Sequence, residues 1–290
     1  MTTIAKAIAE ATSNLESANV DDPRREARLL IGAALQKTST QIFNSVDEII
    51  SQSNLDRISE LLSRRANGEP VAYILGEREF WSLPLMVSPA TLIPRPDSET
   101  LIELVLEHYS DCPPGRILDL GTGSGCLLLA LLSEFKMATG VGVDISADAI
   151  AVAAENAKRV ELFDRSDFLQ GNWTKGQVNT FDLIVSNPPY IPTRDIDGLD
   201  KDVRAFEPMT ALDGGDDGLD MYRAIFSAIS QVLAADGKVV VEIGIGQRDD
   251  VCGIALIHGF DLVQARADIG GIIRGLMFHK KGVGITGGKR

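Results

Sequence analysis

The second half of the chain alternates short apolar runs with amphipathic segments, and this alternation limits the possible folds more than any other feature. The apolar runs are "RILDL" (116–120), "GVGVDI" (140–145), "SDFLQ" (166–170), "FDLIVS" (181–186) and "GKVVVEIG" (237–244). The segments between them show helical spacing, for example "SADAIAVAAENAKRV", with Ser146 as a candidate cap. Strands that alternate with helices predict a doubly wound α/β fold with a mostly parallel sheet. The runs at 260–268 and 271–280 are predicted to form a final strand pair.

Residues 1–79 show a different pattern, which predicts a separate helical domain. Apolar residues recur three and four positions apart in "ARLLIGAALQ" and "LDRISELLSRRA", as they do on one face of a helix. Pro23 suits the first turn of a helix, and Asn54 is a candidate cap for a later one.

Residues 80–96 are predicted to be a β-hairpin linker. Apolar residues alternate from Phe80 to Val87, and the four prolines of this stretch exclude a long helix. The α/β domain is assigned to residues 97–282, and the Gly-rich end, 283–290, is predicted to be a flexible tail.

A glycine-rich loop, "LDLGTGSGC", stands where the first strand of this domain leads into a helix. Gly121, Gly123 and Gly125 allow tight turns and close approach to a ligand, and Asp119 precedes them, with Thr122 and Ser124 between the glycines. The loop lacks the Lys-Ser/Thr ending of a phosphate-binding P-loop. It resembles the cofactor loop of S-adenosylmethionine-dependent methyltransferases. A dinucleotide site or a plain turn is the alternative.

Two further positions follow strand ends of the same sheet. Asp144 ends the second strand, where an acidic residue typically accepts hydrogen bonds from the ribose hydroxyls of a cofactor; a surface or helix-capping role is the alternative. Asn172 and Trp173 follow the third strand. The indole is placed against the adenine ring, with a core or interdomain position as its alternative.

The most specific stretch is Asn187-Pro188-Pro189-Tyr190, directly after "FDLIVS". The prolines lack N–H groups and have fixed φ, so they stiffen the chain without local donors. The side-chain oxygen of Asn187 and the backbone oxygen of Pro188 are then two acceptors beside the face of Tyr190. This set suits a planar NH2 group on an sp2 carbon, held in line with a methyl donor. A planar NH2 group of this kind occurs both in adenine and in the side chain of glutamine. The alternative is that these residues form only a turn that ends the strand.

Longer stretches distinguish the two substrates by resemblance. The stretch "RRANGEPVAYILGEREFWSLPLMVSPATLIPRPDSE" (64–99), "DDPRREARLLI" (21–31) and "FEPMTALDGGDDGLDMYRAI" (206–225) resemble the bacterial peptide chain release factor N5-glutamine methyltransferases, the HemK/PrmC family. Together with the glycine loop and residues 187–190, the resemblance covers all but about the last ten residues.

The resemblance implies a fold, a reaction and roles for individual residues. The fold is a helical substrate-docking domain, a hairpin and a Rossmann-like class I methyltransferase sheet. Gly121 to Gly125 would line the methionine end of S-adenosyl-L-methionine, Asp144 its ribose and Trp173 its adenine. Asn187 to Tyr190 would hold the glutamine of the Gly-Gly-Gln loop of a class I release factor, with Asn187 also bordering the cofactor. Family members often carry Asp where this chain has Asn172, so a role that requires a negative charge at this position does not carry over to this chain.

The linker is also a candidate for framing the protein substrate, through Glu79, Phe80 and Arg95. The alternatives are a glutamine methyltransferase acting on a ribosomal protein, an adenine-specific DNA methyltransferase, and a cofactor-binding protein or RNA-associated module that has lost catalysis. The formal net charge of −13 disfavours a stable nucleic-acid partner. Three scattered cysteines, no metal-type Cys or His spacing, no signal peptide and no apolar run of membrane length predict a cytoplasmic, metal-free protein, expected to be a monomer.

Overall fold

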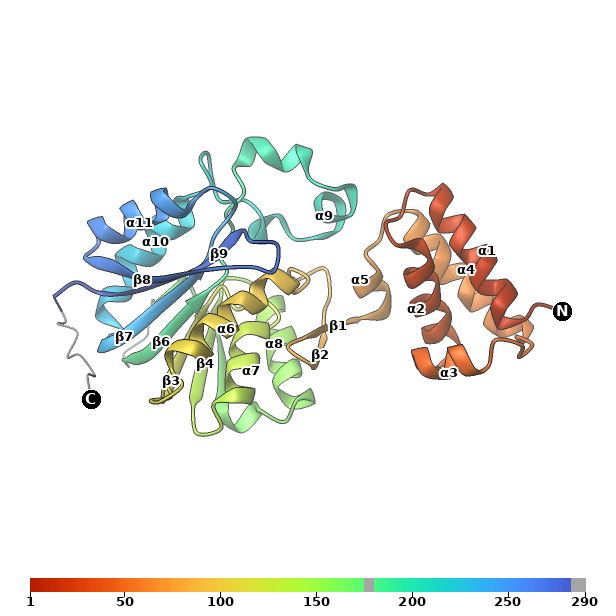
Figure 1. Ribbon diagram of the computed structural model, residues 1–290, viewed down its shortest axis with the longest axis horizontal. Coiled ribbons are helices and arrows are strands. Elements are labelled where there is room, and N and C mark those ends of the chain that lie inside the picture. The colour runs from red at the N-terminus through yellow and green to blue at the C-terminus, as the bar shows by residue number, and fades with distance from the viewer. Residues whose placement is uncertain (175–179, 283–290) are drawn as a thin grey trace. The chain divides into compact units, whose positions relative to one another are not determined.

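The computed structural model describes residues 1–174 and 180–282, so the predicted tail, 283–290, lies outside the described residues. The chain divides into two compact units (Figure 1). The smaller unit contains Met1–Glu77 together with Asp200–Phe206, and the larger contains Arg78–Leu199 and the chain from Glu207 onward.

The smaller unit is built of helices around one apolar core. Its helices are α1 (Ile4–Ser17), α2 (Pro23–Leu35), α3 (Ser39–Asn44), α4 (Gln52–Ala66), α5 (Val71–Leu75) and the distant α9 (Lys201–Phe206). Ile4, Leu15, Leu30 and Ile31 are completely buried in this core. Pro23 occupies the first turn of α2, as predicted.

The predicted cap at Asn54 is wrong. Ser51 caps α4, because its hydroxyl accepts a hydrogen bond from the backbone N–H of Asn54 at 3.4 Å. Asn54 therefore lies within the first turn, three residues after the cap.

Arg65 ties α9 to the other helices of this unit. Only 7% of Arg65 is exposed; its Nε lies 2.5 Å from Glu26 Oε2, and its Nη2 lies 3.8 Å from Asp202 Oδ2. A segment more than 120 residues further along the chain thus belongs to the same small core.

The larger unit contains a seven-stranded sheet in the order β5-β4-β3-β6-β7-β9-β8. Its strands are β3 (Arg116–Leu120), β4 (Thr139–Asp144), β5 (Ser166–Gln170), β6 (Phe181–Ser186), β7 (Leu233–Glu242), β8 (Phe260–Ala267) and β9 (Ile273–Lys280). The first five in this order run parallel, and β9 pairs antiparallel with both β7 and β8. The predicted α/β class and the final strand pair are confirmed.

Helices cover both faces of the sheet, as Figure 1 shows. They are α6 (Glu99–His108), α7 (Cys126–Glu134), α8 (Ala147–Arg159), α10 (Asp220–Ala228) and α11 (Arg248–Ile257). Alternate residues of one strand enter different cores: Leu183 packs with α6 and α7, whereas Ile184 packs with α10 and α11. This layering leaves the carboxyl ends of the parallel strands free to build a site.

A two-stranded hairpin, β1 (Glu77–Phe80) and β2 (Leu83–Met86), precedes the sheet. Its turn consists of Trp81 and Ser82, which both have positive φ, so Trp81 belongs to a turn and not to the alternating strand. Phe80 and Leu85 are buried in the core beside α6 and α7. The suggestion that Phe80 frames a substrate is therefore wrong.

Asn156 joins this hairpin to the glycine loop. It is fully buried on α8; its Oδ1 accepts a hydrogen bond from Met86 N at 2.6 Å, and its Nδ2 donates to Met86 O and Ser124 O, both at 2.9 Å. One side chain thus satisfies three backbone groups from two segments.

Asn156→Ala is expected to lower the free energy of unfolding by about 2–5 kcal/mol, because it leaves buried backbone groups without partners. Urea unfolding of the intact chain measures this loss. The exposed Asn14 on α1 gives a matched control, and Asn14→Ala is expected to change stability by about 0.5 kcal/mol or less. An Asn156→Ala protein as stable as the wild type would contradict the assigned role.

Candidate active site

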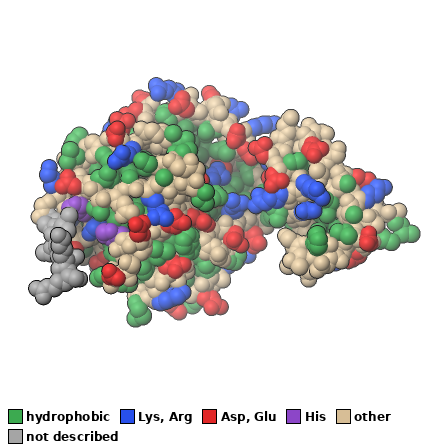
Figure 2. Space-filling model, in the orientation of Figure 1, with side chains coloured by type: hydrophobic (Ala, Val, Ile, Leu, Met, Phe, Trp, Pro, Cys, Tyr) green, Lys and Arg blue, Asp and Glu red, His purple; other side chains and the backbone are tan. Residues whose placement is uncertain are grey.

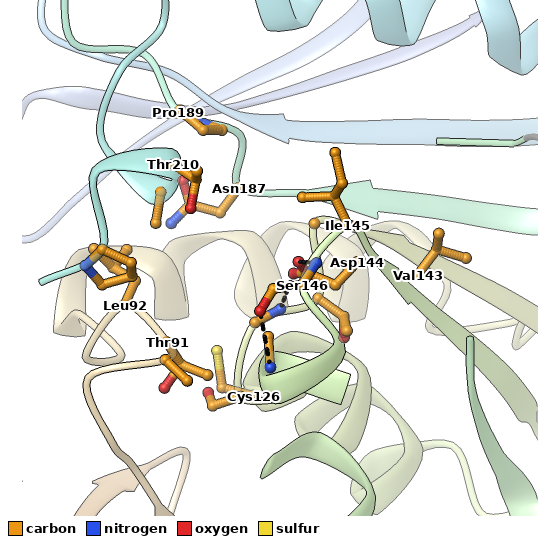
Figure 3. A pocket seen from close by; sticks show the side chains of 18 of the residues that line it. Thr91, Leu92, Cys126, Val143, Asp144, Ile145, Ser146, Asn187, Pro189 and Thr210 are labelled. Carbon is orange, nitrogen blue, oxygen red and sulfur yellow. Dashed lines mark hydrogen bonds between the residues drawn. The ribbon is translucent and has the colours of Figure 1, made fainter. Parts of the chain in front are cut away.

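A cavity of about 520 Å³ opens at the carboxyl ends of β3, β4 and β6. All of its lining residues belong to the larger unit. In Figure 3, Asn187, Pro189 and Thr210 lie on one side of this space, and Asp144, Ile145 and Ser146 lie on the other. Of the residues singled out in the sequence, the lining includes Gly121, Thr122, Gly123, Ser124, Asp144, Asn172, Trp173, Asn187 and Pro189.

The glycine loop forms one wall of the cavity. Gly121, Gly123 and Gly125 have φ of 71°, 54° and 80°, a region that other residues rarely adopt. A side-chain carbon at Gly121 or Gly123 would meet nothing within 4 Å, which leaves room for a ligand against the backbone. Gly125 does not line the cavity; it packs closely against Ala153 and Phe168.

Asp119 lies behind this loop and is 1% exposed. Its Oδ2 accepts a hydrogen bond from Thr122 Oγ1 at 2.6 Å, whereas its Oδ1 has no hydrogen-bond partner among the described residues. The hydroxyl of Ser124, which lines the cavity, is also buried without a partner in this part of the chain. Burial raises the pKa of Asp119 to about 7. Ser124 lines the cavity, whereas Asp119 lies outside its lining, so a ligand in the cavity would satisfy the Ser124 hydroxyl first.

Asp144, the last residue of β4, holds the glycine loop that follows β3. Its Oδ2 accepts a hydrogen bond from Gly123 N and its Oδ1 accepts one from Ser146 N, both at 2.9 Å. Each carboxylate oxygen retains a further lone pair. Ser146 caps α8 as predicted, because its hydroxyl accepts from Ala149 N.

Asn172 and Trp173 line the same cavity after β5. Trp173 has a positive φ of 51° and packs partly against the core beside α10. Its indole therefore combines a place in the cavity wall with a core contact.

The Asn-Pro-Pro-Tyr stretch is divided between cavity and core. Asn187 and Pro189 line the cavity, whereas Pro188 is buried and neither it nor Tyr190 belongs to the lining. The hydroxyl of Tyr190 lies 3.2 Å from Oε1 of the buried Glu242 at the end of β7. Tyr190 is thus anchored by its hydroxyl, a placement that differs from the open stacking face expected from the sequence.

A second glycine-rich loop holds the backbone of this stretch. Ile191 N donates to Leu212 O at 3.1 Å, and Gly214 N donates to Ile191 O at 2.8 Å. A side-chain carbon at Gly214 would lie 2.8 Å from Tyr190 Cα, so only glycine fits this close approach.

Several residues of the site were not identified from the sequence. Ser98 receives a hydrogen bond from Asn187 Nδ2 at 3.1 Å and contacts Glu242 Oε2 at 2.5 Å. Glu207, 6% exposed, accepts hydrogen bonds from Arg95 Nη2 at 2.5 Å and Ile93 N at 3.1 Å, which fixes the cavity-lining Arg95. The available signal for Glu242 was a lone charged residue at the end of the apolar run "VVVE".

The described residues contain no group of three or more His, Cys, Asp or Glu side chains arranged to hold a metal ion. Within the same residues, no helix combines the length and apolar character needed to cross a membrane.

Comparisons with known proteins agree with this architecture. A family model described as the PrmC N-terminal domain matches residues 6–76, and one described as a methyltransferase domain matches residues 113–242. A solved methyltransferase from Pyrococcus furiosus superposes with a TM-score of 0.53 at 17% identity, over 77% of this chain and 99% of its own. At this identity the likeness shows the fold alone.

Sequence relatives match over almost the whole chain. A protein of Agrobacterium fabrum named release factor glutamine methyltransferase is 45% identical over 282 residues, which cover 96% of this chain and 98% of that protein. A protein of Rhodospirillum rubrum with the same name is 43% identical over 270 residues, covering 93% and 83%. The chain therefore belongs to the release factor glutamine methyltransferase family.

Proposed function

We propose that this protein transfers a methyl group from S-adenosyl-L-methionine to the side-chain amide nitrogen of the glutamine in the Gly-Gly-Gln motif of class I peptide chain release factors. The products are N5-methylglutamine and S-adenosyl-L-homocysteine. Membership of the family supports the class of substrate, since its curated relatives are named for this reaction.

One observation carries the proposal, namely the hydrogen bonding of the Asn187 side-chain amide. Its Nδ2 is held by Ser98, and no described residue donates a hydrogen bond to its Oδ1, although the side chain lines the cavity. A fixed amide oxygen accepts one N–H of a planar NH2 group and places that nitrogen for attack. The same contact stabilises the positive charge that develops on the nitrogen during methylation.

The residues of the cavity fit the cofactor that methyltransferases of this fold use. When bound, S-adenosyl-L-methionine supplies an electrophilic methyl group on a sulfonium. Asp119 Oδ1 and Ser124 Oγ are unsatisfied polar atoms suited to its amino acid end, and the open sides of Gly121 and Gly123 leave space for it. In this proposal Asp144 holds the ribose, and Asn172 and Trp173 border the adenine.

The remaining members of the motif have supporting roles in this proposal. The Pro188 carbonyl is assigned as the second acceptor for the glutamine amide, and Pro189 shapes the wall beside it. Tyr190, half-buried and held by Glu242, fixes the backbone of both prolines.

The protein is proposed to act as a cytoplasmic monomer on its protein substrate, without a stable nucleic-acid partner. Acidic and basic side chains are interspersed on the face of the larger unit in Figure 2, and Arg266 is paired with both Glu103 and Glu107. A net charge of −13 adds long-range repulsion of phosphate backbones.

A labelling experiment tests the function. The protein is incubated with methyl-labelled donor and, in separate reactions, with a class I release factor, ribosomal proteins and adenine-containing DNA. We expect label in the release factor alone, lost when the Gly-Gly-Gln glutamine is replaced by alanine. Label only in DNA or in a ribosomal protein would refute the proposal, and label that survives the glutamine replacement would refute the target position.

Asp144→Ala is expected to weaken binding of the methyl donor by roughly 10-fold, while kcat at saturating donor changes little. The variant loses hydrogen bonds to the ribose and the acceptors of Gly123 N and Ser146 N, each worth about 1 kcal/mol. Calorimetric titration with S-adenosyl-L-homocysteine measures the affinity. Asp148→Ala, on the exposed first turn of α8, is the matched control and should bind as the wild type does. Unchanged affinity in Asp144→Ala would exclude the ribose assignment.

A further inference from the structure

The side chains of Ser98 and Tyr190 both contact one buried carboxylate, that of Glu242, and Asn187 is connected to it through Ser98. Glu242 is 1% exposed and ends β7; its Oε2 lies 2.5 Å from Ser98 Oγ, and its Oε1 lies 3.2 Å from Tyr190 Oη. Ser98, itself 2% exposed, lies between Glu242 and Asn187 Nδ2. The chain of contacts therefore runs from the cavity-lining amide through a hydroxyl to the carboxylate, and from there to the tyrosine.

The protons that these side chains carry determine which group is the donor and which the acceptor in each hydrogen bond. The Nδ2 of Asn187 can only donate, so Ser98 Oγ accepts that hydrogen bond and its own proton is free for Glu242 Oε2. Tyr190 donates its proton to Oε1. Both oxygens of Glu242 act as acceptors, which matches the ionised carboxylate.

A proton on Glu242 opposes one of these two hydrogen bonds: on Oε1 it opposes the one from Tyr190, and on Oε2 it opposes the one from Ser98. If the proton lies on Oε2, Ser98 must accept it, and the hydroxyl proton of Ser98 is left with only the Asn187 side chain as a partner. Because an unsatisfied buried hydroxyl proton costs about 1–3 kcal/mol, the Asn187 amide is then favoured with Oδ1 toward Ser98. In that orientation the acceptor oxygen is withdrawn from the cavity.

We propose that ionised Glu242 is a positioning residue, which holds Asn187 through Ser98 so that the amide oxygen faces the substrate and which anchors Tyr190 directly. This inference rests on the proposed role of Asn187 in holding the glutamine amide. Glu242 does not itself line the cavity.

The surroundings of Glu242 shift its pKa upward. Burial raises its pKa to about 7, against the hydrogen bonds from Ser98 and Tyr190 and the charge of Arg274, whereas Asp97 raises it further. Arg274 is in turn paired with Asp97 and Asp268. Two further titratable groups lie near Glu242: Tyr222, whose hydroxyl donates to the backbone carbonyl oxygen of Glu242 at 2.8 Å, and the thiol of Cys126.

The first test observes Asn187 directly in the protein without substrate. The side-chain amide of Asn187 is followed by nuclear magnetic resonance from pH 5.5 to 8.5, together with the carboxyl carbon of Glu242. We expect the amide signals to shift with the same midpoint as the carboxyl group. The dependence should vanish in Glu242→Gln and shrink strongly in Ser98→Ala. Amide signals that ignore the titration of Glu242 would overturn the inference, whatever the substrate is.

The second test measures turnover at saturating methyl donor, so that donor binding does not enter. Glu242→Gln and Ser98→Ala are each expected to lower kcat roughly 10-fold, since small misplacements of a positioning group are costly, with donor affinity unchanged. Because the two residues act in series, the double variant should be no slower than the slower single variant. The wild-type kcat should fall as pH drops below about 7, and this fall should be absent in Glu242→Gln.

Controls separate positioning from folding and from the proposed function. Glu103→Gln, on the exposed face of α6, should leave kcat and its pH profile unchanged. Glu242→Gln should unfold at the same temperature as the wild type or higher at pH 8, because burial disfavours the charged carboxylate that it removes. Normal kcat and an unchanged pH profile in Glu242→Gln would overturn the inference. A wild type that shows the coupled titration but leaves release factor unmethylated would refute the function and sustain the positioning.

Discussion

Asn187→Ala is expected to lower kcat by about 100-fold or more, the effect seen when one fixed hydrogen-bonding group is removed from a charge-stabilising site. The truncated side chain no longer offers the oxygen that accepts from the substrate amide, and the nitrogen loses both its position and its charge stabilisation. Single-turnover transfer from labelled donor to release factor measures the chemical step.

The control for this variant is binding of the methyl donor. The only hydrogen bond of the Asn187 side chain to a described residue is the one to Ser98, so donor affinity and thermal unfolding should change little in Asn187→Ala. Asn187→Asp is also informative, because an aspartate keeps an acceptor oxygen but faces Ser98 with an oxygen in place of Nδ2. Turnover close to the wild-type value in Asn187→Ala would remove Asn187 from the mechanism.

Asp119→Asn is expected to weaken binding of S-adenosyl-L-methionine by roughly 30-fold or more at pH 8. Removing one partner of a buried charge pair costs about 2 kcal/mol at least, and 1.4 kcal/mol is a factor of ten in affinity. In the wild type the pKa of Asp119 is raised to about 7, so the anion that would pair with the donor's ammonium disappears as pH falls. Affinity should therefore drop about 10-fold for each pH unit below about 7 and level off above it.

The same variant separates lost binding from lost folding. The ordinary pKa of Asp119 is 3.8, so its raised value means that the folded state favours the protonated form. Its contribution to stability is complete below about pH 4 and is lost as pH rises through about 7. Without donor at pH 8, Asp119→Asn should thus be at least as stable as the wild type. Equal donor affinity, or a pH dependence that persists in the variant, would contradict the assignment.

The sheet and its loops were predictable because their signals are local. Alternating apolar runs located the strands from β3 to β9, and glycines located the turn after β3, where left-handed residues occupy every second position from Gly121 to Gly125. The cap at Ser146 follows from the same kind of short-range pattern.

Local signals also compete, and there the sequence misleads. Ser51 and Asn54 are both good capping residues three positions apart, and the helix uses the first. The segment 219–233 shows helical periodicity, yet α10 ends at Ala228, a 3-10 turn follows at Ile229–Gln231, and Leu233 pairs with Phe181 and begins β7. Tertiary pairing decided the boundary.

The support of the site was hidden from the sequence for a different reason. Ser98 is separated from Asn187 by 89 positions and from Glu242 by 144. Neither periodicity nor turn chemistry relates residues so far apart, and only the pairing of β6 with β7 and the packing of the start of α6 bring them together. The motif identified the reacting side chain, whereas the residues that orient it required the fold.

The position of α9 has a consequence for modularity. Because Asp200–Phe206 belongs to the same compact unit as the N-terminal helices, the chain passes between the two units after Glu77, after Leu199 and after Phe206. A fragment that ends at Glu77 lacks Asp202, one of the acidic partners of Arg65. The helical unit therefore cannot be replaced by that of a relative through one fusion point in the gene. Recombination between relatives would have to carry two separate stretches of sequence together.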